Sequence, residues 1–266
     1  MATSNEPDPR FDSQVLTYKP ESIIAAIETY YKALSKLPYV EESHIISPPT
    51  SGWPNITESN FAPLEKTNTV INLLKHLPYL QNPEKEKGYA IAFGTFPIDY
   101  TAAPFREPID IQEAKNFKPD LAWPEDAVKG WVIPLTMSED NYWGNWWLLD
   151  TTDGTVTDWA HNNSTEADVD YAPDDPRSWR NTCGETKKLE DLLAEWRSKF
   201  ESLHWVAFAD PTGREKVWND EDIQRDEDTE HCEELQAIIR KHGWPVNFKR
   251  QECKEALETW MEDHQT

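Results

Sequence analysis

The residue pair Asp153-Gly154 constrains the fold of this 266-residue chain more than any other feature. It separates two β-rich runs within NWWLLDTTDGTVTDWA, residues 145–160. Asp-Gly predicts a tight hairpin with a type I′ turn, because both central positions of that turn need positive φ and this pair tolerates it. The apolar residues before the turn are continuous, which is typical of a central strand covered on both faces. We therefore expect the tryptophans of this segment to fill the interior of a sheet.

The rest of the chain predicts helices and further strands around that hairpin. Apolar residues at helical spacing indicate helices, and two of them end at Leu-Pro because the residue before proline is pushed out of the helical region. In the β-rich run WVIPLTM, Pro134 marks an edge strand or a bulge. The sequence Gly243-Trp244-Pro245 fits a motif that ends a helix. The expected helices cover residues 20–37, 67–77, 189–206, 235–242 and 248–263, and the expected strands cover residues 89–96, 131–137, 145–151 and 155–160.

This order of elements predicts an α+β fold with a mostly antiparallel sheet flanked by helices, and with a C-terminal helical hairpin. Residues 1–18 are expected to form a flexible arm and residues 19–218 the α+β domain. Residues 219–266 are expected to form an acidic linker followed by the hairpin. The stretch 161–186 has no period and is rich in Asp, Asn and Pro, so we expect a long surface loop there.

The formal net charge of -23 narrows the range of partners. Such a charge repels phosphate backbones and anionic lipid surfaces, so neither nucleic acid nor a membrane is the expected partner. It is compatible with a basic protein partner or a cationic ligand, and also with the simpler role of keeping the protein in solution. The sequence has no secretory leader, no run of about 20 apolar residues and no CxxC spacing, so we expect a cytoplasmic protein with reduced thiols.

Sequence motifs that carry a strong mechanistic rationale are absent: there is no GxSxG, Walker loop, GxGxxG, HExxH or DxDxDG. We therefore predict no catalytic residue, no cofactor and no metal site. The adjacent His231 and Cys232 point apart on a helix, so they are not expected to share a metal ion. Cys183 is a candidate nucleophile with His161 or His204 as its base, but nothing in the sequence places these residues together.

A small-molecule site is the alternative interpretation of the aromatic segment. Trp143, Trp146 and Trp147 lie close in sequence to Asp150, so these four residues are the candidate ligand-binding residues. Tryptophan is favoured at binding surfaces because of its large area and its single donor. In the structural interpretation, Asp153 forms the turn while Asp150 caps it or hydrogen-bonds to the backbone. The tryptophans in loop segments, which are the better candidates for exposure, are Trp53, Trp123, Trp143 and Trp179.

Residues 20–205 contain, in order, an N-terminal helix, a helix ending in Leu-Pro, the strands WVIPLT and NYWGNWWLLDTTDGTVTDW, and the helix LEDLLAEWRSKF. This order resembles fungal proteins of the SMI1/KNR4-like group, in the SUKH superfamily. The resemblance implies an α+β domain with a mostly antiparallel sheet and a binding role without catalysis. The residues that match the group's turn, Asp150, Asp153 and Gly154, are structural in this comparison.

We therefore expect a non-catalytic protein-interaction or regulatory module of this type. The alternative is an enzyme of fungal specialised metabolism with a Trp-lined small-molecule pocket near Asp150. A deep apolar cavity holding a carboxylate or histidine of strongly perturbed pKa would favour that enzyme. A glycan-binding module is a third hypothesis, but the sequence lacks the export signal that such proteins commonly need.

Overall fold

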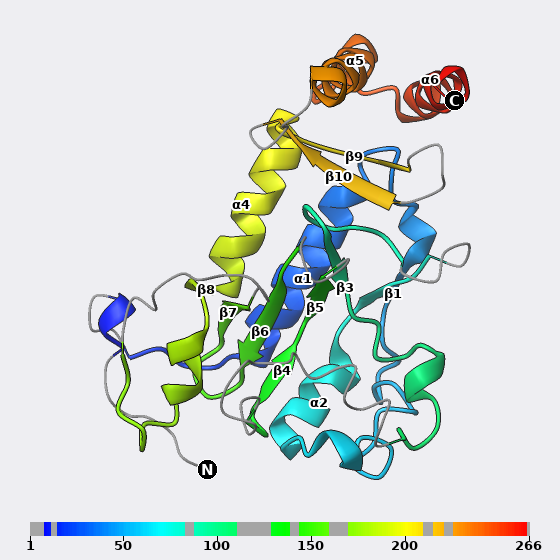
Figure 1. The fold of residues 1–266 in the computed structure, drawn as a ribbon. Helices are drawn as coiled ribbons and strands as arrows, with labels where there is room; N and C mark the ends of the chain where they lie inside the picture. The colour runs from blue at the N-terminus through cyan, green and yellow to red at the C-terminus, as the bar shows by residue number, and fades with distance from the viewer. Residues whose placement is uncertain are drawn as a thin grey trace.

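The computed structural model has the predicted α+β fold (Figure 1) and describes residues 8–11, 15–82, 88–110, 129–138, 144–159, 170–209, 215–220 and 226–264. The α-helices are α1 (Pro20–Leu34), α2 (Asn68–His76), α4 (Leu189–Ser202), α5 (Asp226–Lys241) and α6 (Arg250–Asp263). Short 3-10 helices are η1 (Pro9–Phe11), η2 (Glu42–His44), η3 (Ala62–Leu64), η4 (Ala103–Phe105) and η5 (Ser178–Thr182). The strands are β1 (Ile45–Ile46), β2 (Tyr79–Leu80), β3 (Thr95–Pro97), β4 (Val132–Pro134), β5 (Thr136–Ser138), β6 (Trp146–Asp150), β7 (Thr155–Trp159), β8 (Thr186–Lys188), β9 (Trp205–Ala209) and β10 (Glu215–Asn219).

A four-stranded antiparallel sheet in the order β4-β6-β7-β8 lies at the centre of the fold. β6 is an inner strand, as its continuous apolar run predicted. β4 lies at the edge of this sheet, as Pro134 predicted. The chain breaks its regular pairing at Leu135, and β5 then pairs with β3. The main-chain N–H of Leu135 still donates to the carbonyl of Trp147 at 2.8 Å, so the break is local.

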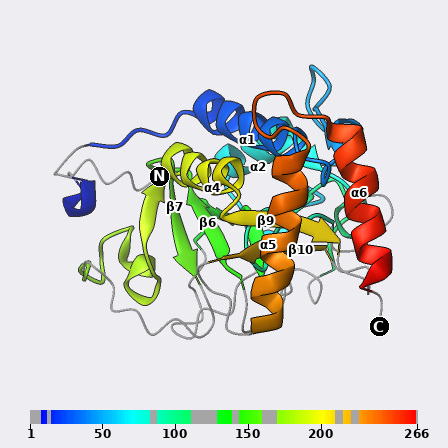
Figure 2. The same ribbon diagram turned by 90° about the horizontal axis from the view of Figure 1, so that it is seen from above.

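Both faces of the sheet are covered. Helices α1 and α4 lie side by side over one face (Figure 2), where Trp147 joins a large hydrophobic cluster. Its ring centroid is 6.0 Å from that of Trp196 on α4, which lies 5.9 Å from that of Tyr30 on α1. A smaller cluster on the other face contains Val132, Leu148, Trp159, Trp179 and Cys183. Large aromatic side chains therefore fill the interior on both sides of β6.

The prediction of a surface loop at 161–186 is wrong for the second half of that stretch. Residues 170–183 pack on the outer face of the sheet, and η5 places Trp179 in the smaller cluster with 4% of its surface exposed. Trp179 is therefore not an exposed tryptophan, and Trp53 is half-buried. The polar composition concealed this packing because it depends on a few side chains spread along the segment, those of Tyr171, Arg177, Trp179, Arg180 and Cys183. Residues 160–169 and Trp123 lie outside the described residues.

The β6–β7 hairpin is confirmed, but its turn is not type I′. The strands are joined by Thr151–Gly154, and the N–H of Gly154 donates to the carbonyl of Asp150 at 2.8 Å. Gly154 has a φ of 82°, whereas Asp153 is not in the positive-φ region. Asp150 and Asp153 instead accept hydrogen bonds from threonines two residues further on, which stabilises a longer turn.

Several element boundaries also differ from prediction. Helix α4 ends at Ser202 because Leu203 takes a left-handed conformation with a φ of 65°. The residues that follow, expected to be helical, form β9, which pairs with the unpredicted β10. Helix α1 ends at Leu34, before Leu37. The strand expected at 89–96 is regular only at Thr95–Pro97.

The C-terminal helical hairpin is confirmed and is docked on the body of the protein. Helices α5 and α6 pack side by side (Figure 2), and Gly243 between them has the predicted left-handed φ, 90°. The Arg250 guanidinium donates to the carbonyls of Ser35, Leu37 and Val40, at 3.2, 3.2 and 2.9 Å, just after α1 ends. α5 begins at Asp226, so much of the expected acidic linker is helical. Within the described residues, no helix has the length and apolar character that crossing a membrane requires.

Candidate functional site

The predicted ligand-binding residues do not converge on one pocket. Side chains alternate along a strand, so Trp146 and Asp150 point to one face of β6 and Trp147 to the other. Trp147 packs with the large cluster, while Trp146 is half-buried and its indole N–H donates to Ser138 Oγ at 3.1 Å. Trp143 lies outside the described residues. The sheet itself therefore separates Trp147 from Asp150.

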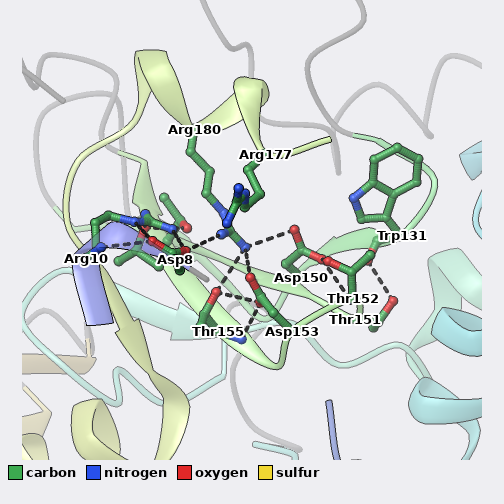
Figure 3. Close-up of polar contacts among 12 residues, drawn as sticks. Asp8, Arg10, Trp131, Asp150, Thr151, Thr152, Asp153, Thr155, Arg177 and Arg180 are labelled. Carbon is green, nitrogen blue, oxygen red and sulfur yellow. Dashed lines mark hydrogen bonds and ion pairs between the residues drawn. The ribbon is translucent and has the colours of Figure 1, made fainter. Parts of the chain in front are cut away.

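Asp150 is fully buried and belongs to an ionic cluster (Figure 3). Nη2 of Arg180 lies 2.9 Å from Oδ2 of Asp150 and 2.9 Å from Oδ2 of Asp153. The second oxygen of Asp150 accepts from the N–H and the hydroxyl of Thr152, at 2.8 and 2.6 Å. Both carboxylates are thus committed to holding the turn, as the structural interpretation expected. This arrangement leaves Asp150 ion-paired and enclosed.

The electrostatics of the cluster follow from its burial. Burial raises the pKa of the Asp150 carboxyl, against the attraction of Arg180, which favours the charged form. Burial also disfavours the charged Arg180 guanidinium, but Asp153 and Asp150 together raise its pKa above the ordinary value. Removing one partner would leave a buried charge uncompensated, so the cluster is a structural clamp between η5 and the β6–β7 turn.

The cavity that Trp147 lines is too small for a metabolite. It lies between the sheet and helices α1 and α4, and it has a volume of about 30 Å³. Pockets that bind small molecules commonly have volumes of about 300–1,000 Å³. Tyr30 and Trp196 contribute to the wall, which among the described residues includes neither Asp150 nor another carboxylate.

One unusual carboxylate, Asp158 on β7, was not predicted from the sequence. It is 8% exposed, and its Oδ1 has no hydrogen-bond partner within the described part of the chain. Burial, reinforced by the nearby Glu185, raises the pKa of Asp158 to about 7, although Lys187 opposes this. Its position inside the strand TVTDW was a signal, because an aspartate in a covered strand is rarely solvated. Asp158 lies opposite Trp147 in the sheet but does not line the 30 Å³ cavity.

The candidate thiol nucleophile is not assembled with a base. Cys183 is buried, and burial raises the pKa of its thiol to about 12, so the reactive thiolate is disfavoured. His204 hydrogen-bonds through Nδ1 to Asp220 at 3.0 Å. His161 lies outside the described residues.

A cluster of aromatic rings forms where β10, α5 and α6 meet. The ring of His231 stacks on Trp218 with a centroid distance of 5.9 Å and meets the edge of Trp260 at 5.3 Å. His264 stacks on Trp260 at 4.2 Å and lies 5.1 Å from His231. All four side chains are half-buried, so each retains a solvent-facing part. The four residues span 46 positions in sequence, from Trp218 to His264, which is why no local pattern predicted their contacts.

Carboxylates lie beside these rings. Oε2 of Glu234 accepts from the indole N–H of Trp260 at 2.6 Å and lies 3.6 Å from Nε2 of His264. Glu230 lies one turn before Glu234 on the same side of α5 and is also exposed. We call this surface the acidic–aromatic patch, and it consists of Trp218, Glu230, His231, Glu234, Trp260 and His264.

The charges of the helical hairpin are segregated along its length. α6 ends in Glu262 and Asp263, with no basic residue in its last turn. Carboxylates at a helix C-terminus oppose the helix dipole by about 0.3–1 kcal/mol each, so these two do not stabilise α6. The basic residues lie towards the connection between the helices, with Arg240 and Lys241 in the last turn of α5 and Arg250 at the start of α6. Helix stability therefore does not explain the negative C-terminal end of α6.

Among the described residues, no group of three or more His, Cys, Asp and Glu side chains is arranged to hold a metal ion. Comparison of the chain with models of protein families, with curated proteins and with solved structures gives no match. Any inference about function therefore rests on the chemistry of the side chains described above.

Proposed function

We propose that the protein is a non-catalytic protein-interaction or regulatory module, of the kind that its SUKH-like sequence features imply. It acts in the cytoplasm and binds a basic segment of a protein partner through the acidic–aromatic patch. The observation that carries the proposal is the packing of two half-buried tryptophans and two histidines beside exposed glutamates on α5.

The chemistry of the patch suits a lysine- or arginine-containing chain. A cation over the face of a tryptophan gains about 0.5–2 kcal/mol, and Trp218 and Trp260 are both partly exposed residues. Tryptophan is also enriched among the few residues that dominate binding energies. The surrounding carboxylates speed association with a positive partner and disfavour negative ones. With a net charge of -23, a basic protein segment is a better partner than nucleic acid or an anionic membrane.

A random peptide library displayed on phage tests this proposal, because it samples binding segments of any sequence. The library is selected in parallel on the unmodified protein, on a patch variant and on a control variant. The patch variant carries Glu230→Gln and Glu234→Gln. The control variant carries the same number of neutralisations at exposed sites elsewhere, Glu58→Gln and Glu107→Gln.

We expect peptides rich in Lys and Arg to be enriched on the unmodified protein and on the control variant, and to bind the patch variant at least about tenfold more weakly. Equal loss of binding in both variants would indicate a non-specific effect of net charge and would contradict a localised site. Failure to enrich any peptide on the unmodified protein would count against the interaction-module proposal itself.

A second candidate function is enzymatic conversion of a small molecule, with Asp158 as the catalytic base. A buried carboxylate whose pKa is about 7 is suited to act as a general base near neutral pH. A fragment screen by thermal shift at pH 8 tests it: ligands of an Asp158 site should stabilise the unmodified protein but not Asp158→Asn. Identical shifts in the two proteins would exclude that site.

A further inference from the structure

The tripeptide Asp-Pro-Arg occurs twice in the chain, at residues 8–10 and 175–177. In both copies the arginine folds back onto its own aspartate. The N–H and Nε of Arg10 each donate to Oδ1 of Asp8 at 3.0 Å, and Nη2 lies 2.6 Å from Oδ2. The same three contacts join Arg177 to Asp175, at 2.7, 3.0 and 2.8 Å. Each copy is therefore a preorganised clip in which proline fixes the backbone φ.

Both clips converge on one tyrosine. The guanidinium of Arg10 lies 5.2 Å from the ring centroid of Tyr171, and that of Arg177 lies 4.8 Å from the same centroid. The hydroxyl of Tyr171 donates to Oδ1 of Asp8 at 3.0 Å. The second clip is local in sequence to Tyr171, whereas Asp8 is separated from it by 163 positions. The N-terminal clip thus reaches the tyrosine from a distant part of the chain.

The remaining contacts of the N-terminal clip are polar. Arg10 donates through Nη1 to the hydroxyl of Thr186 on β8. Oδ2 of Asp8 lies 3.6 Å from Nη1 of Arg180. No residue of the segment 8–11 belongs to either hydrophobic cluster of the described residues. The segment is therefore held by ionic contacts, hydrogen bonds and stacking rather than by burial in a core.

Arg180 supplies an independent reason to expect a ligand at this position. Its side chain is 1% exposed, and Nη2 already contacts Asp150, Asp153 and Thr155 (Figure 3). Nε and Nη1 have no hydrogen-bond partner within the described residues. A buried N–H donor without an acceptor lowers the stability of the folded protein. The carboxylate that faces Nη1 is that of Asp8.

We infer that Tyr171, Arg180 and Thr186 form a receptor for an Asp-Pro-Arg segment, and that residues 8–10 are its resident ligand. The ligand class is a short chain segment in which a carboxylate faces Arg180 and a guanidinium covers the tyrosine ring. Because the carboxylate and guanidinium neutralise each other, such a segment avoids the repulsion that the protein's net charge imposes on a simple anion. This site involves different residues from the acidic–aromatic patch and does not depend on the proposed function.

Binding of the segment in trans tests the inference. The probe is a fluorescently labelled peptide with the sequence of residues 4–14, and the protein is the full chain carrying Asp8→Ala and Arg10→Ala. We expect this variant to bind the peptide, and the unmodified chain to bind it at least about tenfold more weakly, because the tethered segment competes at an effective concentration in the millimolar range. Replacing the peptide's aspartate by alanine, or adding Tyr171→Phe to the protein, should weaken binding about tenfold.

Two results would overturn the inference. One is a cooperatively folded double variant that binds the peptide no better than the unmodified chain does. The other uses the unmodified chain and so does not depend on the fold of the variant. Millimolar peptide should accelerate amide hydrogen exchange at residues 8–11 by displacing the resident segment, and unchanged exchange in the presence of excess peptide would contradict a receptor.

Discussion

Among single residues, Arg180 has the largest predicted effect on stability. Arg180→Met keeps much of the side-chain volume but leaves Asp150 and Asp153 without their cation, so we expect a loss of about 3–5 kcal/mol in the free energy of unfolding. Adding Asp150→Asn should recover part of that loss. Urea denaturation measures both effects, with Arg197→Met, whose side chain is 43% exposed, as the control. A loss below about 1 kcal/mol would show that the ionic cluster does not hold residues 170–183 on the sheet.

Asp158 gives a prediction about pH. Its folded pKa of about 7 lies above the ordinary value of 3.8, so the protonated carboxyl stabilises the folded state. That contribution is complete below about pH 4 and is lost as the pH rises through about 7. Asp158→Asn mimics the protonated form, and its stability advantage over the unmodified protein should be about 2–3 kcal/mol larger at pH 8 than at pH 5.

Urea titrations at the two pH values measure this difference. Asp191→Asn, at an exposed position on α4, controls for general effects of removing a negative charge. An advantage of Asp158→Asn that is the same at both pH values would mean that the folded protein does not raise the pKa of Asp158.

Individual side-chain roles could be predicted where they depend on near neighbours in sequence. Asp150 and Asp153 were correctly assigned to the turn because their threonine partners lie two residues away. Arg180 and Asp158 escaped prediction because their environments come from the packing of a distant segment on the sheet. Nothing in a polar stretch indicates which of its arginines becomes buried.

At the scale of elements, strong apolar periodicity predicted helices α1, α2, α4 and α6, and a continuous apolar run followed by Asp-Gly predicted strands β6 and β7. The errors lie where a single residue takes an unusual conformation or where pairing is non-local. Leu203 ends α4 early through its left-handed φ, and β9 then forms only because β10 pairs with it. The turn after β6 lengthens because side-chain hydrogen bonds replace a type I′ backbone.

The docking of the C-terminal hairpin provides the prediction at this scale. Arg250→Ala removes donors from three carbonyls beyond the end of α1, and hydrogen bonds to charged groups contribute about 1.5–3 kcal/mol. We expect amide hydrogen exchange in α6 and in residues 35–41 to accelerate about tenfold or more, while exchange in α4 stays unchanged. Lys249→Ala removes an adjacent exposed charge and is the control. Unchanged exchange in α6 after Arg250→Ala would show that other contacts hold the hairpin.

At the scale of the whole molecule, composition predicted a strongly acidic protein but not where the charge matters. The acidic–aromatic patch brings together residues of β10, α5 and α6, so the fold of the C-terminal hairpin was needed to reveal it. The central sheet separates Trp147 from Asp150, and the cavity that Trp147 lines has a volume of only about 30 Å³. The most informative surface thus lies in the C-terminal part of the sequence, away from the tryptophan segment first considered for binding.

The central claim is that this patch binds a basic segment. A hydrogen-exchange footprint of the protein with a library-selected basic peptide tests that claim most directly. We predict slower exchange confined to residues 215–219, 226–234 and 258–264, and loss of this protection in the variant that carries Glu230→Gln and Glu234→Gln. Protection that falls instead on β6 and β7, or on helices α1 and α4, would contradict the assignment of the binding surface.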